Sequence, residues 1–216
     1  MTKGKKSRIR NKNKIELLVP AGGMEQFLAA VENGADAIYV GGQLFNARYS
    51  AKNFDKDGIR EAVNYAKSRN VKINFTLNIL LKNNEFDDAI EVVKYIYELG
   101  VDAVIVDDFG FAKYIIDNFP GMEVHGSTQM TIHNLEGAIA LKNLGYSRVV
   151  LARESTLSDI DYICRNANID IEAFVHGAIC ISYSGQCLFS SAIGGRSGNR
   201  GRCAQPCRMY YNMLET

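Results

Sequence analysis

Short apolar runs alternate along this chain with longer segments in which apolar residues recur three and four positions apart. The short runs are rich in β-favouring residues and predict strands buried on both faces. Their ranges are 15–20, 37–40, 72–78, 103–107, 123–127, 148–152 and 171–177. The longer segments predict amphipathic helices, including those at 24–34, 59–70, 85–100, 134–145 and 156–166.

The same helix ending recurs three times. A glycine stands just before the next predicted strand in NGADAIYV, ELGVDAVIV and NLGYSRVVL, as Gly34, Gly100 and Gly145. Glycine at this position favours a left-handed cap that ends a helix. The repetition therefore indicates one βα unit used several times in succession.

Repeated βα units close either as an open doubly wound sheet or as a (β/α)8 barrel. About seven units are present, which favours an α/β fold of the TIM-barrel type that is incomplete. Either the terminal residues 209–216 supply the last strand, or the chain is a fragment. We expect the barrel domain to occupy residues 15–216, with a cysteine-rich loop at 177–208.

Charge is unevenly distributed. The net charge of the chain is +1, but residues 1–14 hold seven Lys and Arg and no acidic residue, which leaves about −6 on the remainder. We expect 1–14 to be a basic disordered tail that aids solubility or contacts nucleic acid. The chain has no apolar run of membrane-spanning length and no signal-peptide core, which predicts a cytoplasmic protein without a membrane partner.

In a barrel, the residues that follow the carboxyl ends of the strands build the active site. The sequence nominates catalytic candidates at five such positions: Asp107, Gln129, Arg153, Glu154 and His176. Asn78 and Ser127 are the substrate-binding candidates of the same rim. Asp107 and Arg153 are also candidates for an ion pair, structural or functional. His125, inside a predicted strand, is expected to be a core histidine.

Four of the five cysteines lie close together, with the spacing Cys-x6-Cys-x15-Cys-x3-Cys, as Cys180, Cys187, Cys203 and Cys207. Four thiolates suit a tetrahedral zinc or a [4Fe–4S] cluster. Neither pair forms the Cys-x2-Cys knuckle of a zinc ribbon, so the spacing favours iron–sulfur; zinc and unliganded thiols remain alternatives. Cys164 stands apart, in a predicted helix.

The cysteine-rich loop is also basic. Arg196, Arg200 and Arg202 are interleaved with glycine, serine and asparagine. Such a loop suits phosphate or carboxylate groups, and we consider these arginines as substrate-binding candidates. A merely solvated loop is the alternative.

The segment 172–190, EAFVHGAICISYSGQCLFS, resembles the signature of peptidase family U32. Further matching motifs are LVPAGG, DAIYVGG, STQM, LARESTL and NRGRCAQPCR, so the resemblance covers nearly all of residues 15–210. It implies collagenase-like proteolysis, or hydroxylation of tRNA uridine with prephenate or of 23S rRNA cytidine. It also implies a [4Fe–4S] cluster on Cys180, Cys187 and Cys203, with Cys207 or a residue farther downstream as fourth ligand. Family members usually continue well past the cysteine loop.

Three functions follow. The first is an iron–sulfur hydroxylase of tRNA or rRNA, in which Arg153 and the loop arginines hold an anionic donor such as prephenate and His176 helps to position the substrate. The second is a peptidase that uses Cys180 with His176, four residues away. The third is a non-catalytic scaffold that bears a cluster and works with a partner protein.

Overall fold

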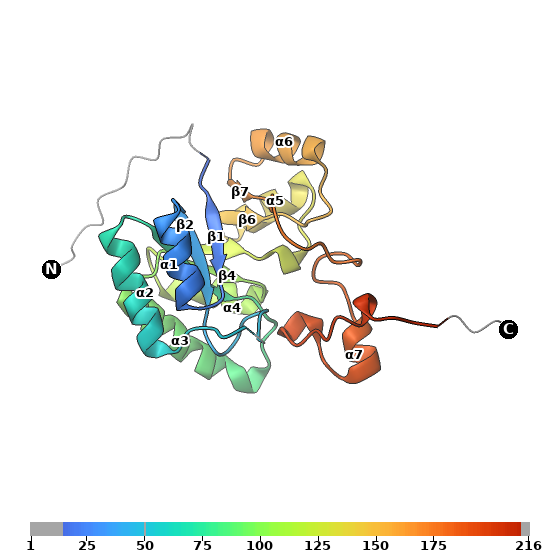
Figure 1. The fold of residues 1–216 in the computed structure, drawn as a ribbon. Helices are drawn as coiled ribbons and strands as arrows, with labels where there is room; N and C mark the ends of the chain where they lie inside the picture. The colour runs from blue at the N-terminus through green and yellow to red at the C-terminus, as the bar shows by residue number, and fades with distance from the viewer. Residues whose placement is uncertain (1–14, 50, 213–216) are drawn as a thin grey trace.

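The computed structural model describes residues 15–49 and 51–212, and its seven strands form one sheet in chain order (Figure 1). All neighbouring strands are parallel. They are β1 (Leu18–Ala21), β2 (Ala37–Gly41), β3 (Lys72–Leu77), β4 (Ala103–Val106), β5 (Glu123–Gly126), β6 (Arg148–Val150) and β7 (Asp170–Glu172). The predicted strands and the incomplete barrel are therefore confirmed, with β1 and β7 as the two edges. The predicted basic tail, 1–14, lies outside the described residues.

A helix follows each of the first six strands. These helices are α1 (Met24–Glu32), α2 (Lys56–Ser68), α3 (Phe86–Leu99), α4 (Phe109–Asn118), α5 (Leu135–Asn143) and α6 (Leu157–Asn166). Helix α4 occupies a segment for which the sequence analysis named no helix, and it begins where Asp108 accepts a hydrogen bond from the N–H of Phe111. Gly34, Gly100 and Gly145 have φ of 89°, 74° and 101°, which confirms that each glycine ends a helix with positive φ.

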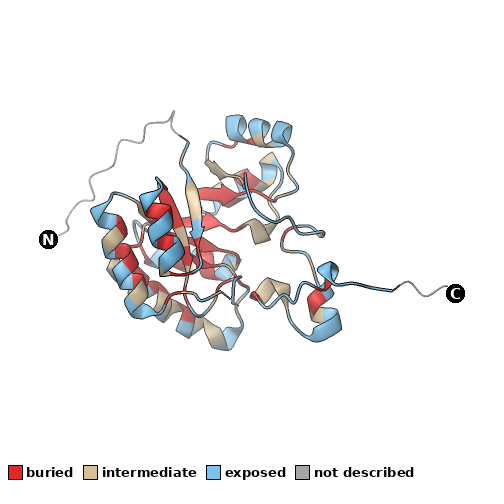
Figure 2. Cartoon of the chain, in the orientation of Figure 1, coloured by how far each residue is buried: buried red, intermediate tan, exposed pale blue. Residues whose placement is uncertain are grey.

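The apolar core lies between the helices and one face of the sheet. Val40, Phe75 and Val104 are paired in register across β2, β3 and β4, and all three are buried. Their side chains therefore share one face of the sheet. Figure 2 shows that the helices turn their buried sides toward the sheet and their exposed sides outward. Removal of this apolar surface from water is the main stabilising contribution to the fold.

The opposite face of the sheet, inside the partial barrel, is polar. Thr76 on β3 pairs with Ile105 on β4, Ile105 pairs with His125 on β5, and His125 pairs with Arg148 on β6. Paired residues share a face, and Thr76, His125 and Arg148 are all buried. Asn74, two residues before Thr76, is also buried there. The strands are thus buried on both faces as predicted, but the inner face mixes buried polar residues with apolar ones such as Ile105.

The segment 173–212, which we call the cysteine arm, leaves the sheet after β7. It contains α7 (Phe189–Gly194) and two 3-10 turns, η3 (Gly198–Arg200) and η4 (Pro206–Arg208). Figures 1 and 2 show it projecting from the body of the protein with a mostly exposed surface. Residues 209–212 form no strand, so this described part of the terminal piece does not complete the barrel. None of the helices in the described ranges is long and apolar enough to cross a membrane.

Candidate functional site

The polar residues that the sequence nominated lie at one rim, because the strands are parallel and each residue follows a strand end. Asn78 follows β3, Asp107 follows β4, Ser127 follows β5 and Arg153 comes soon after β6. Gly41 closes β2 on the same side. The carboxyl rim of the partial barrel is therefore where the candidate chemistry gathers.

Three rim candidates form one hydrogen-bonded network. The side-chain amide of Gln129 donates to the carbonyl oxygen of Asn78 at 2.8 Å. Asn78 Oδ1 accepts from the N–H of Ala47 at 3.0 Å, and Ser127 Oγ accepts from the N–H of Gln129 at 3.2 Å. Ser127 thereby caps η2 (Thr128–Met130). The network joins the loops after β2, β3 and β5 and fixes the shape of the rim.

Asp107 is buried at the rim, and no Lys or Arg among the described residues pairs with it. Burial raises its pKa to about 6, and the neighbouring carboxylate of Asp108 acts in the same direction. Asp108 itself accepts hydrogen bonds from the N–H groups of Phe111 and Leu81, at 2.9 Å and 3.2 Å. Asp107 can therefore gain or lose a proton near neutral pH, as a general acid or base must.

The sequence suggested an ion pair between Asp107 and Arg153. This suggestion is wrong, because these two described residues do not pair. The Arg153 guanidinium instead lies 4.2 Å from the ring centre of Phe174, at the start of the cysteine arm. The flat cation stacks on the aromatic face, which holds the side chain in place and leaves its edge available.

A second arginine faces the same space. Burial raises the pKa of Tyr39 on β2, while the positive charges of Arg48 and Arg153 act on its hydroxyl in the opposite direction. Both guanidinium groups therefore lie near this half-buried tyrosine. Two arginines and a phenol at a barrel mouth suit a carboxylate or phosphate. Sequence reasoning missed Arg48 and Tyr39, because neither directly follows the motifs at the strand ends.

The cysteine arm is attached to the rim on the β5–β6 side. Glu154 Oε1 accepts a hydrogen bond from the N–H of Ser184 at 2.7 Å, and Thr131 Oγ1 donates to the Ser184 carbonyl at 2.6 Å. Gly185, at φ 72°, lies so close to the carbonyl of Gln129 that a Cβ atom would overlap it. We call this contact the first anchor.

A second anchor lies on the β2–β3 side. Arg200 donates to the carbonyl of Leu80 at 2.6 Å and pairs with Glu85 at 2.5 Å. Gly201 packs on the backbone of Asn46, again without room for a Cβ atom. Because the two anchors lie on different parts of the rim, the cysteine arm crosses the mouth of the partial barrel.

The arm arginines differ in their contacts. Arg200 is engaged in the second anchor, while Arg196 Nε donates to the Arg202 carbonyl at 3.2 Å. The Arg202 guanidinium lies 4.9 Å from the ring centre of Tyr49 and is otherwise open to an anion. As substrate-binding candidates, Arg196 and Arg202 remain predictions, whereas the contacts of Arg200 are those of a structural residue.

His176 and Cys180 are both exposed on the arm, and no hydrogen bond joins them in the described structure. A nucleophilic thiol needs a base within hydrogen-bond reach. The arrangement therefore gives the proposed Cys–His pair no geometric support, and His176 remains a candidate for positioning substrate only.

The four arm cysteines are free thiols. Cys180, Cys203 and Cys207 are exposed, and Cys187 is half-buried. The Cys203 side chain and the Cys187 carbonyl both lie within 4 Å of the position that a Gly198 Cβ atom would occupy. Among the described residues, no three Cys, His, Asp or Glu side chains are already arranged around a common metal position. The donor chemistry fits an iron–sulfur cluster or zinc, but the arm would have to draw its thiols together to bind either.

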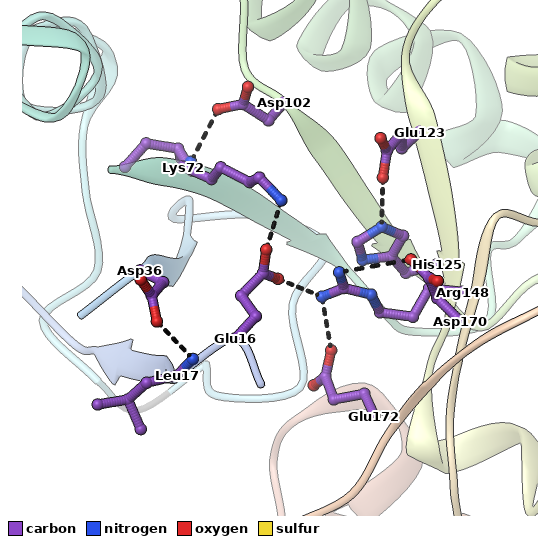
Figure 3. Close-up of polar contacts among 11 residues, drawn as sticks. Glu16, Leu17, Asp36, Lys72, Asp102, Glu123, His125, Arg148, Asp170 and Glu172 are labelled. Atoms are coloured by element: carbon purple, nitrogen blue, oxygen red, sulfur yellow. Dashed lines mark hydrogen bonds and ion pairs between the residues drawn. The ribbon is translucent and has the colours of Figure 1, made fainter. Parts of the chain in front are cut away.

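A cluster of charges fills the interior below the rim (Figure 3). Arg148 is buried and pairs with Glu16 at 2.8 Å, Glu172 at 3.6 Å and Asp170 at 3.8 Å; Lys72 also pairs with Glu16. Burial raises the pKa of Glu172 to about 7, against the opposing charge of Arg148. The cluster ties β3, β6 and β7 to Glu16, two residues before β1.

Two side chains of the inner face, among several buried side chains of the described residues, have a polar atom without a hydrogen-bond partner. Asn74 Nδ2 and His125 Nδ1 are buried and lack a hydrogen-bond partner within the described ranges. His125 Nε2 lies 3.3 Å from Glu123, so the expected core histidine is satisfied on one nitrogen only. The alternation of Lys72, Asn74, Thr76 and Asn78 in KINFTLN is the sequence signal that could have revealed this polar inner face.

These features define a partial (β/α)8-type barrel with a cysteine-bearing arm across its carboxyl rim. Residues 22–216 match the sequence profile of peptidase family U32, and the chain belongs to this family. The resemblance predicted from the motifs is thereby confirmed.

Three curated relatives illustrate the family. The chain is 42% identical over 203 residues to a 23S rRNA 5-hydroxycytidine synthase of Escherichia coli (strain K12), which covers 94% of this chain and 30% of the relative. It is 39% identical to tRNA hydroxylation protein P1 of Bacillus subtilis (strain 168), over 94% and 48% of the two chains. A collagenase of Porphyromonas gingivalis (strain ATCC BAA-308 / W83) is 33% identical, over 95% and 52%. The chain thus spans about a third to a half of these relatives.

The fold is also similar to a solved structure of the U32 peptidase Mk0906. The TM-score is 0.66 at 15% identity, and the match covers 81% of this chain and 74% of the other. This likeness supports the barrel-type fold.

Proposed function

We propose that this protein is an RNA-modifying hydroxylase that acts on tRNA or rRNA. The observation that carries the proposal is the 42% and 39% identity, over 94% of the chain, to proteins named for rRNA and tRNA hydroxylation. Both matches extend over most of the described rim, and the family profile reaches through the cysteine arm. An RNA substrate would place the protein in the cytoplasm, and the basic tail would add phosphate contacts.

We further propose that Cys180, Cys187, Cys203 and Cys207 hold a [4Fe–4S] cluster, with zinc as the alternative. Their reduced state and exposure leave the thiols available. The arm that bears these cysteines is held to the rim at both anchors. Such a cluster would supply redox chemistry.

The chain's own residues would bind and orient the other reactants. Arg153 and Arg48, whose positive charges both act on Tyr39, suit the carboxylates of a small anionic oxygen donor such as prephenate. Asp107, with its pKa of about 6, is suited to accept or donate a proton at the rim. The arm above them would exclude water from the mouth.

The first test is the metal content of protein purified without oxygen. We expect iron and sulfide in equal amounts with visible absorbance, retained in Cys164→Ser and lost in Cys187→Ser. Cys164 is the matched control because it lies on α6, outside the arm. Zinc without iron would favour the zinc alternative. The absence of both metals would refute a metal cofactor bound by these cysteines.

The second test is activity. The protein with its cofactor bound is incubated with tRNA or rRNA and prephenate. The RNA is then digested to nucleosides, and their masses are measured by mass spectrometry. A mass gain of one oxygen atom, lost in Arg153→Ala, supports the hydroxylase. Gelatin cleavage without any RNA change would instead favour a peptidase, the activity named for the Porphyromonas relative.

A further inference from the structure

A small cavity of about 190 Å³ lies beside the first anchor, apart from Asp107 and the arginines of the mouth. Its wall includes Thr131, His133, Glu154, Ser155, Asp159 and Tyr183. Sites for drug-sized ligands usually measure roughly 300–1,000 Å³. This cavity is therefore suited to one planar ring rather than to a whole nucleotide.

The wall is rich in hydrogen-bond acceptors. Glu154 uses Oε1 to hold Ser184, while Oε2 has no partner in the described structure. His133 Nδ1 lies 2.9 Å from the Thr131 carbonyl. A carbonyl oxygen can only accept, so Nδ1 is the donor in this contact. The free oxygen of Glu154 is therefore the acceptor to which a ligand with an N–H donor can bind.

The cavity also has an aromatic side. Tyr183 is 68% exposed, and its ring forms part of the wall. The Ser155 hydroxyl is buried and has no hydrogen-bond partner in the described part of the chain, so a polar ligand could satisfy it after a small side-chain shift. An exposed ring beside unpaired polar atoms is the arrangement by which proteins bind an unstacked nucleobase.

We infer that this cavity binds one unpaired cytosine of the RNA, stacked on Tyr183, with its exocyclic amine donating to Glu154. The inference rests on the proposed function. Cytosine fits because its amine matches a carboxylate, as in the known pairing of Glu or Asp with cytosine N4. Uracil has a carbonyl oxygen at that position, which a carboxylate repels, and a purine has two rings. Glu154 is then a recognition residue rather than a catalytic one.

The test compares two short labelled single-stranded RNAs that differ only in one central base, cytosine or uracil, among adenines. Fluorescence anisotropy with the 216-residue protein should give about tenfold tighter binding of the cytosine RNA, the order expected for one good base contact. Glu154→Gln keeps an oxygen for Ser184 but replaces the other acceptor with an N–H2 donor. The preference should therefore vanish or reverse toward uracil.

Two further variants complete the test. Glu136→Gln removes the same charge from an exposed site on α5, outside the cavity, and should leave the preference unchanged. Tyr183→Leu should weaken binding of the cytosine RNA several-fold, and its exposure means that folding is not at risk. Equal binding of both RNAs by the unmodified protein, or a preference that Glu154→Gln does not change, would overturn the inference while leaving RNA hydroxylation intact. Failure to bind either RNA would count against the proposed function itself.

Discussion

Gly185 of the cysteine arm lies directly against the carbonyl oxygen of Gln129, although the two residues are far apart in the chain. The contact is close because Gly185 has no Cβ atom and adopts φ 72°, which other residues rarely tolerate. Gln129 also donates to the Asn78 carbonyl. One glycine therefore connects the arm to a rim network that reaches β3.

Replacement of Gly185 by alanine should release the first anchor. The positive φ and the overlap with Gln129 together should cost about 1–3 kcal/mol, enough to open the arm locally. Limited proteolysis should then cut within residues 175–195 faster than in the unmodified protein. Gly194→Ala is the matched control, because a Cβ atom there meets nothing within 4 Å. Equal cleavage of both variants would show that the contact does not hold the arm.

The ion pair of Arg200 with Glu85 should stabilise the second anchor. Both side chains are partly covered, at 28% and 23% exposure, so the pair should contribute about 1 kcal/mol in a double-mutant cycle of Arg200→Ala and Glu85→Gln. Hydrogen exchange of residues 196–208 should accelerate when either partner is removed. The exposed pair of Arg165 with Asp161 offers the comparison cycle, where we expect a smaller coupling. No coupling between Arg200 and Glu85 would contradict their role as an anchor.

The strand and helix pattern of the barrel was readable from the sequence because local chemistry determines it. Gly34, Gly100 and Gly145 adopt positive φ wherever the βα repeat predicted it. Helix α4 was not among the predicted helices, although Asp108 caps its first turn in the usual way. The rim itself followed from the rule that parallel strands point their carboxyl ends the same way.

Contacts between distant segments were not readable. The pairing of Arg153 with Phe174 in place of Asp107, and the approach of Arg48 to Tyr39, depend on how loops fold over the rim. Sequence spacing fixes which residues follow a strand, but not the direction in which a loop side chain points. The same limit applies to Arg200: the composition of its loop suggested phosphate or carboxylate binding, and nothing in the sequence indicated its pair with Glu85.

Asp107 should make stability depend on pH. Its pKa rises from 3.8 to about 6 on folding, so the folded protein binds more protons than the unfolded chain between these values. The free energy of unfolding is therefore highest, with respect to this group, below pH 3.8. It decreases as the pH rises from 3.8 to 6, because the buried carboxylate then becomes charged. Asp107→Asn should therefore stabilise the protein by about 1–2 kcal/mol at pH 8 and have little effect at pH 4.

Denaturant unfolding at both pH values measures this difference. Asp117→Asn on the exposed end of α4 is the control, because its carboxylate is half exposed and forms a surface pair with Lys113. If Asp107→Asn also lowers the pH optimum or abolishes hydroxylation, the same proton serves the chemistry. A stabilisation that is equal at both pH values would contradict the raised pKa.

Arg148 should be the most sensitive residue of the interior. Arg148→Met leaves the half-buried carboxylates of Glu16 and Glu172 without their shared cation. Because they are 22% and 16% exposed and Glu16 keeps its pair with Lys72, we expect a loss of about 2–3 kcal/mol, below the roughly 3–5 kcal/mol of a fully buried pair. The loss should be smaller at pH 5 than at pH 8, because Glu172, with its pKa already near 7, takes up a proton and ceases to be an unpaired charge. Unfolding by urea at the two pH values gives the comparison.

Arg148→Lys, which keeps a cation, should recover part of the loss, and Arg165→Met at an exposed pair should change stability little at either pH. A loss from Arg148→Met that does not depend on pH would mean that packing of the side chain, rather than its charge, stabilises the interior.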